Sequence, residues 1–154
     1  MGRLLGRYQA TLDEKGRTNI PARIRRVLSP DPESPIIITR GYDDCLAVYP
    51  LAEWEAVEKD LRALPYNVGN TRLFAREMAS HAVEAGLDRS GRILIPREHR
   101  EWAHLEKDIL VLGVITHLEL FNPEIYERYR SGYGMTYEGV AEEMQKYRST
   151  GRQE

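Results

Sequence analysis

One ten-residue pattern occurs twice in this chain and constrains its fold more than any other feature. Residues 12–21 read LDEKGRTNIP and residues 87–96 read LDRSGRILIP, so six of the ten positions are identical. The separation is 75 residues here and 72 between Gly41 and Gly113, so the second copy lacks three residues, most simply opposite 29–35. A unit of about 75 residues has therefore been duplicated, and two copies are too few for a solenoid.

Each copy predicts the same order of secondary-structure elements. Apolar residues alternate with polar ones from Tyr8 to Leu12, as in a half-buried strand, and Gly16 then permits a tight turn. Further along the first copy, the pattern predicts strands over 17–20, 36–39 and 45–49, a hairpin turn over 41–44, and helices over 22–28, 51–64 and 71–80. In the second copy it predicts strands over 82–88, 92–95, 109–112 and 117–121, helices after Pro96 and Pro123, a loose segment over 131–139, and a charged helix or tail over 142–154.

Neither half is expected to fold alone, because four short strands with two helices would leave open sheet edges. The first unit is predicted over 1–76, with its β core at about 7–52. The second is predicted over 77–154, with its β core at about 81–124 and a C-terminal helix or tail. We therefore expect an α+β, mainly β fold in which the two halves close one barrel within the chain.

The charge distribution and the cysteine content constrain the ligands and the cellular compartment expected for this chain. The net charge is −2, yet residues 1–30 contain seven basic and two acidic side chains, a balance of +5. This asymmetry is compatible with phosphate binding, although a scattered, solvated charge set would give the same count. Cys45 is the only cysteine, which excludes an internal disulfide and favours a reducing compartment. With neither an apolar run long enough for a membrane span nor a signal-peptide core, a cytoplasmic protein is expected.

Catalytic sites are not indicated. The four histidines (81, 99, 104 and 117) have no zinc-ligand spacing with Cys45, and there is neither a glycine-rich phosphate loop nor a nucleophile elbow. We therefore expect no enzyme activity, no metal, no cofactor and no small-molecule substrate. The tyrosines and tryptophans are interpreted as packing residues of the core and hairpins.

The doubled Leu-Asp-x-x-Gly-Arg-x-x-Ile-Pro segment, with Tyr49–Trp54 after the first copy, closely resembles the MraZ family of bacterial regulators. The resemblance implies two SpoVT-AbrB-type units that form a swapped-hairpin AbrB-type barrel with peripheral helices. It also implies a nucleoid-associated, ring-like homo-oligomer that binds double-stranded DNA. The implied function is sequence-specific transcription regulation of division and cell-wall genes, through repeats upstream of its own operon.

In that family the Asp-x-x-x-Arg motif marks the DNA-facing surface, which here corresponds to Asp13 with Arg17 and Asp88 with Arg92. A turn that projects Arg and Lys from a rigid hairpin places cations against phosphates or guanine edges. The second copy has Ser90 in place of Lys15, and Glu101 in place of Arg26. The halves are therefore expected to contribute unequally, with the second the weaker.

Roles follow for the remaining candidates. The DNA-binding set is Lys15, Arg17, Arg92, Arg25 and Arg26, of which the last two are as well suited to bracing the barrel as to contacting phosphate. Since carboxylates repel DNA, Asp13 and Asp88 are interpreted as structural acceptors of turn N–H groups. Gly16 and Gly91 are expected to let the backbone approach the duplex. An alternative is an antitoxin-like module whose acidic C-terminal residues (138, 142, 143 and 154) wrap a basic partner protein.

Overall fold

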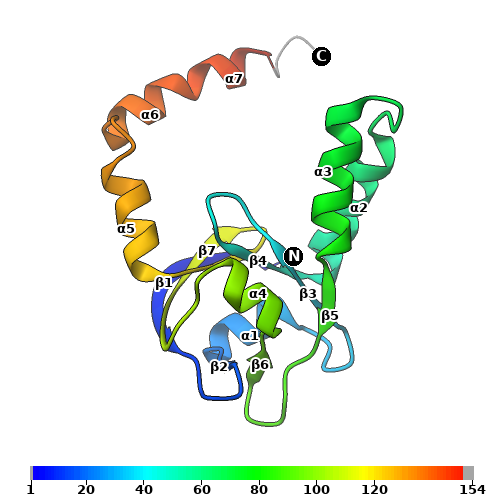
Figure 1. Cartoon of the computed structure of the whole chain (residues 1–154), viewed down its shortest axis with the longest axis vertical. Coiled ribbons are helices and arrows are strands. Elements are labelled where there is room, and N and C mark those ends of the chain that lie inside the picture. Colours follow the sequence, from blue (N-terminus) through cyan, green and yellow to red (C-terminus); the bar gives the residue numbers. More distant parts are fainter. Residues whose placement is uncertain (1, 151–154) are drawn as a thin grey trace.

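The computed structural model describes residues 2–150 as short strands and helices in alternation (Figure 1). The strands are β1 (Leu4–Thr11), β2 (Arg17–Asn19), β3 (Ile36–Arg40), β4 (Leu46–Pro50), β5 (Val83–Ala85), β6 (Arg92–Leu94), β7 (Asp108–Ile115) and β8 (Leu118–Phe121). The helices are α1 (Ala22–Leu28), α2 (Leu51–Ala63), α3 (Gly69–Ser80), α4 (Arg97–Trp102), α5 (Pro123–Ser131), α6 (Tyr137–Glu143) and α7 (Gln145–Thr150). The fold is thus mixed α+β.

The two halves are interleaved in both sheets. The larger antiparallel sheet has the strand order β1-β7-β8-β4-β3-β5, and β2 pairs with β6 in a separate two-stranded ribbon. Strand β1 pairs with β7 along its whole length, and β4 pairs with β8. The equivalent strands of the two halves are β1 and β5, β3 and β7, and β4 and β8. When each strand is replaced by its equivalent, the same order is obtained, read from the opposite edge of the sheet. The halves are therefore related by a pseudo-twofold axis.

Local sequence explains the hairpin and several helix starts. Asp43 and Asp44 both have φ of 64° in the turn that joins β3 to β4, and aspartate tolerates such positive values better than most residues. Prolines 21, 50 and 96 directly precede α1, α2 and α4, where the fixed φ suits the helix entry and no intrahelical donor is lost. The Asn122 side chain caps α5 by accepting from the N–H groups of Glu124 and Ile125.

One apolar core draws on both halves and therefore joins them. Its members include Leu4, Ile38 and Ile93, all with no exposed surface. Outside it, Tyr49 and Trp54 pack ring against ring at 5.6 Å between centroids, which fixes α2 over the sheet. This shared core is the physical reason for expecting that neither half folds alone.

Several segments differ from the sequence-based expectation, among them β1, which starts at Leu4 and not at Tyr8. Strand β5 covers only Val83–Ala85 because it lies at the sheet edge and pairs with three residues of β3. Strand β7 runs over Asp108–Ile115 because the eight residues of β1 pair along it. The segment predicted to be loose contains the start of α6, which Thr136 caps by accepting from the Gly139 N–H.

Helices α2–α3 and α5–α7 project from the sheet on the side opposite the β2–β6 ribbon (Figure 1). Several tyrosines here are exposed, which contradicts the expectation that the aromatic residues are packing residues. Tyr137 is 87% exposed and Tyr66 64%, and Tyr133 is also exposed. These projections therefore carry apolar surface that the described part of the chain does not cover.

Candidate nucleic-acid interface

The first Asp-x-x-x-Arg motif forms a closed turn held by its aspartate. Oδ1 of Asp13 accepts hydrogen bonds from the backbone N–H groups of Lys15 and Arg17, each at 2.9 Å. Its Oδ2 accepts from Nε of Arg17 at 2.7 Å. Two backbone bonds close the turn, from the Asp13 N–H to the Arg17 carbonyl and from the Gly16 N–H to the Asp13 carbonyl. One carboxylate therefore shapes the turn and orients the arginine.

The second motif repeats this geometry. Asp88 accepts from the backbone N–H groups of Ser90 and Arg92 at 2.9 Å, and from Nε of Arg92 at 2.8 Å. Hydrogen bonds from the arginine backbone lower the pKa of both aspartates, with further lowering from the guanidinium. Both carboxylates are therefore held in their charged form, as acceptors within the turn.

Within residues 2–150, the turns leave the terminal nitrogens of each guanidinium without a hydrogen bond. Arg17 and Arg92 lie at the first positions of β2 and β6, and their side chains are each 30% exposed. Arg17 is thus half-buried beside its aspartate instead of standing free on an exposed turn. An arginine has five N–H donors, and the hydrogen bonds within residues 2–150 use only Nε of each side chain. The Nη1 and Nη2 atoms of both side chains are therefore oriented by the Nε contact but keep their own donors for another partner.

The β2–β6 ribbon places the two arginines on one surface. The antiparallel register pairs Arg17 with Leu94 and Asn19 with Arg92, so these four side chains share a face. The residues between them, Thr18 and Ile93, are buried on the other face. Asn19 and Leu94 were missed in the sequence analysis, although alternation from Arg17 and Arg92 would have identified them.

The glycines of the motif pack against arginines of the opposite half. Gly16 and Gly91 have φ of 84° and 76°, which favours glycine. Each is covered by an arginine from the other half: a Cβ on Gly16 would lie 2.7 Å from Cζ of Arg100, and one on Gly91 1.5 Å from Nη1 of Arg25. Both glycines are buried, so their missing side chains accommodate arginines of this protein itself.

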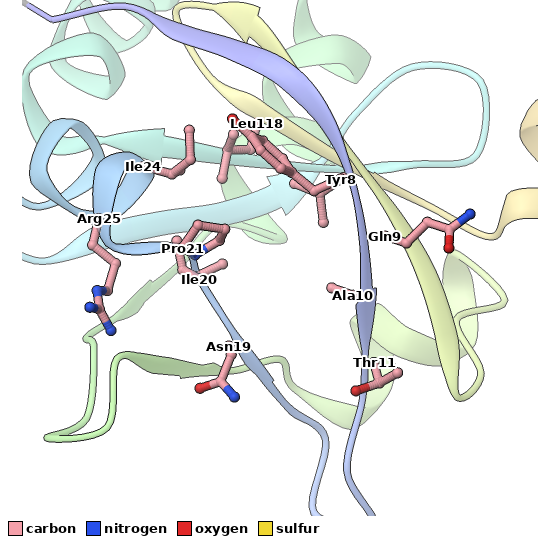
Figure 2. Close-up of a pocket in the computed structure, with 11 residues that line it drawn as sticks. Tyr8, Gln9, Ala10, Thr11, Asn19, Ile20, Pro21, Ile24, Arg25 and Leu118 are labelled. Carbon is pink, nitrogen blue, oxygen red and sulfur yellow. The ribbon is translucent and has the colours of Figure 1, made fainter.

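Arg25 and Arg26 point to different parts of the molecule, as neighbouring residues on a helix do. Nη1 of Arg25 lies 3.5 Å from the Ser90 carbonyl oxygen, and Arg25 shares with Asn19 a hollow of about 410 Å³ beside β1 and β2 (Figure 2). Arg26 lines a separate hollow with Pro50 at the start of α2. The structure therefore brings Arg25 to the second turn and leaves Arg26 apart from the ribbon.

Each end of the ribbon gathers its own set of charges. The Arg17 end has three cations and two carboxylates, a net charge of +1, from residues 13, 14, 15, 17 and 100. The Arg92 end has three cations and one carboxylate, a net charge of +2, from residues 25, 88, 89 and 92. The prediction that the second half binds DNA more weakly took account of Ser90 in place of Lys15. It did not take account of Arg89 in place of Glu14. Lys15 and Arg89 are both exposed.

The remaining candidate features lie elsewhere. Three of the acidic residues proposed to wrap a partner protein are on α6, where Glu143 pairs with Lys146 at 2.9 Å, and Glu154 lies outside the described residues. Within residues 2–150, no group of three histidine, cysteine or carboxylate side chains is placed to hold a metal ion. None of the helices in that range has the length and apolar character needed to cross a membrane.

Comparison with known proteins adds a family assignment to this geometry. The chain matches the family described as "MraZ protein, putative antitoxin-like" twice, over residues 4–77 and 78–146. It is 39% identical to "Transcriptional regulator MraZ" of Caldanaerobacter subterraneus subsp. tengcongensis, over 94% of this chain and 98% of that protein. The proteins with the same description from Pelotomaculum thermopropionicum and Moorella thermoacetica are 41% and 42% identical, over 91% of this chain and 94% and 95% of theirs. The chain therefore belongs to the MraZ family.

Proposed function

We propose that this protein is a DNA-binding transcriptional regulator that presents its β2–β6 ribbon and the two adjoining turns to double-stranded DNA. Its curated relatives are transcriptional regulators, and the family is not enzymatic. The bound DNA is read in the major groove, which is wide enough for a two-stranded β-ribbon.

The observation that carries the proposal is the paired orientation of Arg17 and Arg92. Each guanidinium is fixed through Nε by the aspartate of its own turn, which leaves its two terminal nitrogens for a second partner. Guanidinium groups form bidentate pairs with guanine O6 and N7, or with phosphate oxygens. Because both side chains lie on one face of the ribbon, a single duplex contacts both.

The other basic residues have supporting roles. Lys15 and Arg89 are exposed in the two turns, where they contact phosphates and thereby add salt-dependent affinity without reading sequence. Arg25 braces the second turn, as Arg100 braces the first. Arg26 is too far around α1 to join the ribbon face and contributes to the general positive potential.

Repeated binding sites and self-assembly complete the proposal. One ribbon offers few cations, which gives weak binding at physiological salt, whereas several linked ribbons bind with high effective concentration. The exposed apolar side chains of α2–α3 and α5–α7, such as Tyr66, Leu73 and Tyr137, provide surface for contacts between copies. The protein is thus a ring-like homo-oligomer in the cytoplasm, associated with the nucleoid. It binds repeats upstream of its own operon and regulates division and cell-wall genes.

A salt-dependent mobility-shift assay with the DNA upstream of its own gene tests DNA binding. Arg17→Ala and Arg92→Ala should each weaken binding by about 1–3 kcal/mol per engaged subunit if the lost contact is to a base. Arg62→Ala removes the same charge from a side chain on α2 that is 82% exposed, and should bind like the wild type. Equal affinity of all four proteins, with unchanged melting temperatures, would refute the ribbon as the DNA-binding surface.

Self-assembly is tested separately by light scattering at micromolar concentration. We expect a single multimeric species whose mass does not depend on the Arg17 or Arg92 substitutions, because the projecting helices lie on the opposite side of the sheet. A monomer would contradict the ring. The antitoxin-like module stays an alternative prediction, and co-purification of a small basic partner protein would support it.

A further inference from the structure

Strand β1 lies at an edge of the larger sheet and pairs with β7 on one side only. The N–H of Leu12 donates to the Lys107 carbonyl at 2.8 Å, directly beyond the last residue of β1. In an antiparallel pair, residues bonded to the neighbouring strand alternate with residues whose backbone groups point the other way. Counting back from Leu12, the residues whose N–H and carbonyl groups point away from β7 include Arg7, Gln9 and Thr11.

These outward backbone groups are unpaired. Within residues 2–150, no N–H or carbonyl of Arg7, Gln9 or Thr11 has a backbone partner outside β7. Together they cover about 14 Å of edge, the length of an extended segment of about five residues. Strand β5, at the opposite edge of the sheet, has three residues and offers less. The edge of β1 is therefore a template on which another strand can form main-chain hydrogen bonds.

The hollow of about 410 Å³ lies along this same edge, between β1 and the segment 19–25 (Figure 2). Its volume is within the range of about 300–1,000 Å³ found for ligand pockets. Much of its lining is apolar and includes Ile24 and Leu118. Gln9 points away from it, whereas Ala10 points toward it (Figure 2). Because strand side chains alternate, a segment added to β1 places every second side chain in the hollow.

The charges at the hollow favour an acidic segment. Arg25 is the one charged residue among the described residues that line it. Its guanidinium makes one hydrogen bond, at 3.5 Å to the Ser90 carbonyl, so further donors are available. Nη2 of Arg23 donates to the hydroxyl of Tyr8 at 3.2 Å, which brings a second cation to this edge. Within residues 2–150, neither arginine is paired with a carboxylate.

We propose that the free edge of β1 and the adjoining hollow dock an extended, acidic segment of a partner protein by strand addition. The segment bonds to the backbone of Gln9 and Thr11, an apolar side chain enters the hollow, and a neighbouring carboxylate pairs with Arg25. Such docking does not require DNA on the ribbon. Its failure would therefore leave DNA binding by Arg17 and Arg92 intact.

Fluorescence anisotropy with the full-length protein tests the docking. The probe is a labelled peptide of about nine residues in which valine alternates with aspartate, a pattern that forms an extended strand. The same peptide with lysine in place of aspartate is its charge-reversed counterpart. The acidic peptide should bind with saturation and more weakly as salt is added, and the basic peptide should not bind. Equal binding of both peptides, or binding of neither, would overturn the proposal.

Two variants locate the bound peptide. Arg25→Gln should weaken its affinity by about 10-fold, as expected for loss of a charge-assisted hydrogen bond, and should make binding less sensitive to salt. Arg26→Gln removes the same charge from the next residue, which lines a separate hollow, and should bind like the wild type. Gln9→Pro removes a donor that β7 does not use and should abolish binding without loss of the fold. Equal affinity of Arg25→Gln and Arg26→Gln would refute the assignment of this site.

Amide hydrogen exchange in the wild type gives a test that depends on no variant. The amides of Tyr8 and Ala10, which bond to β7, should be protected with and without peptide. Those of Gln9 and Thr11 should exchange rapidly in the free protein and slowly with the acidic peptide. Unchanged exchange at both positions would contradict strand addition. Protection of both in the free protein would show that a second copy of this chain covers the edge, and would likewise overturn the proposal.

Discussion

Replacing Gly91 by alanine should destabilise the protein through a contact between the two halves. The residue has φ of 76°, and an alanine held in this left-handed region costs roughly 1–2 kcal/mol. In addition, its Cβ would lie 1.5 Å from Nη1, 2.6 Å from Cζ and 2.9 Å from Cδ of Arg25. Bending the tip of the side chain relieves the first two contacts, but relieving the third requires Arg25 to leave the turn.

Loss of the Arg25 packing adds about 1 kcal/mol, on the order of one lost polar contact. The expected destabilisation by Gly91→Ala is therefore about 2–3 kcal/mol. For a chain of this length, each kcal/mol lowers the melting temperature by about 2–4 °C. Thermal and denaturant unfolding of Gly91→Ala should thus show a decrease of roughly 4–12 °C.

A double-mutant cycle separates the two contributions. In an Arg25→Ala background the steric conflict is absent, so Gly91→Ala should cost only the backbone strain, and the coupling free energy should be about 1 kcal/mol. The equivalent cycle with Gly16→Ala and Arg100→Ala should couple in the same direction, because Arg100 covers Gly16. An identical cost of Gly91→Ala in both backgrounds would show that Arg25 does not occupy this space, and would refute the bracing of each turn by the opposite half.

Three further outcomes are expected. Asp88→Asn should reduce the stability of the protein at neutral pH. Because the turn lowers the pKa of Asp88, the stabilisation by its carboxylate is complete above the ordinary pKa of about 3.9 and is lost as the pH falls below that value. Unfolding measured over an acid pH series should therefore show the stabilities of the variant and the wild type converging. Asn122→Ala should lower the free energy of unfolding by about 1–2 kcal/mol, because it removes the cap of α5 and leaves the His104 carbonyl without its 2.8 Å hydrogen bond. Glu124→Gln, which keeps the cap, is the control. Equal melting temperatures of the two variants would contradict the capping role of Asn122. A fragment ending at Asn70 should be insoluble or dimerise with itself, since β1 and β4 lose β7 and β8; a monomeric fragment that melts cooperatively would disprove the shared core.

The sequence predicted the parts of the fold that local chemistry determines. Helix α1 covers the predicted residues 22–28, because Pro21 and the apolar spacing define its limits. The hairpin turn at Asp43 and Asp44 was equally predictable from the sequence, since aspartate tolerates positive φ. Family membership was also predictable from the doubled motif, which the match over both halves confirms.

What the sequence did not predict depends on partners distant in the chain. The length of β7 is determined by β1, which pairs with it beyond Gly113, where the glycine interrupts the local strand pattern. The covering of Gly16 by Arg100 and of Gly91 by Arg25 joins residues of different halves. The two arginines are 75 positions apart and so occupy equivalent places in the two copies, but this spacing does not show what they contact. Helix α6 was missed because the segment from Tyr137 has little apolar periodicity, and a single capping threonine precedes it.

The pairing of β1 with β7 has a consequence for synthesis of the chain. Leu4 leaves the ribosome early, but its partner Ile115 is added 111 residues later. At about 5–20 residues per second, β1 spends roughly 5–20 s without the strand that satisfies its backbone groups. Throughout that interval it is an unprotected edge, open to pairing with other nascent chains on the same messenger RNA. For this protein, slow elongation before residue 115 should therefore increase aggregation, and codon choice between β1 and β7 becomes a determinant of yield.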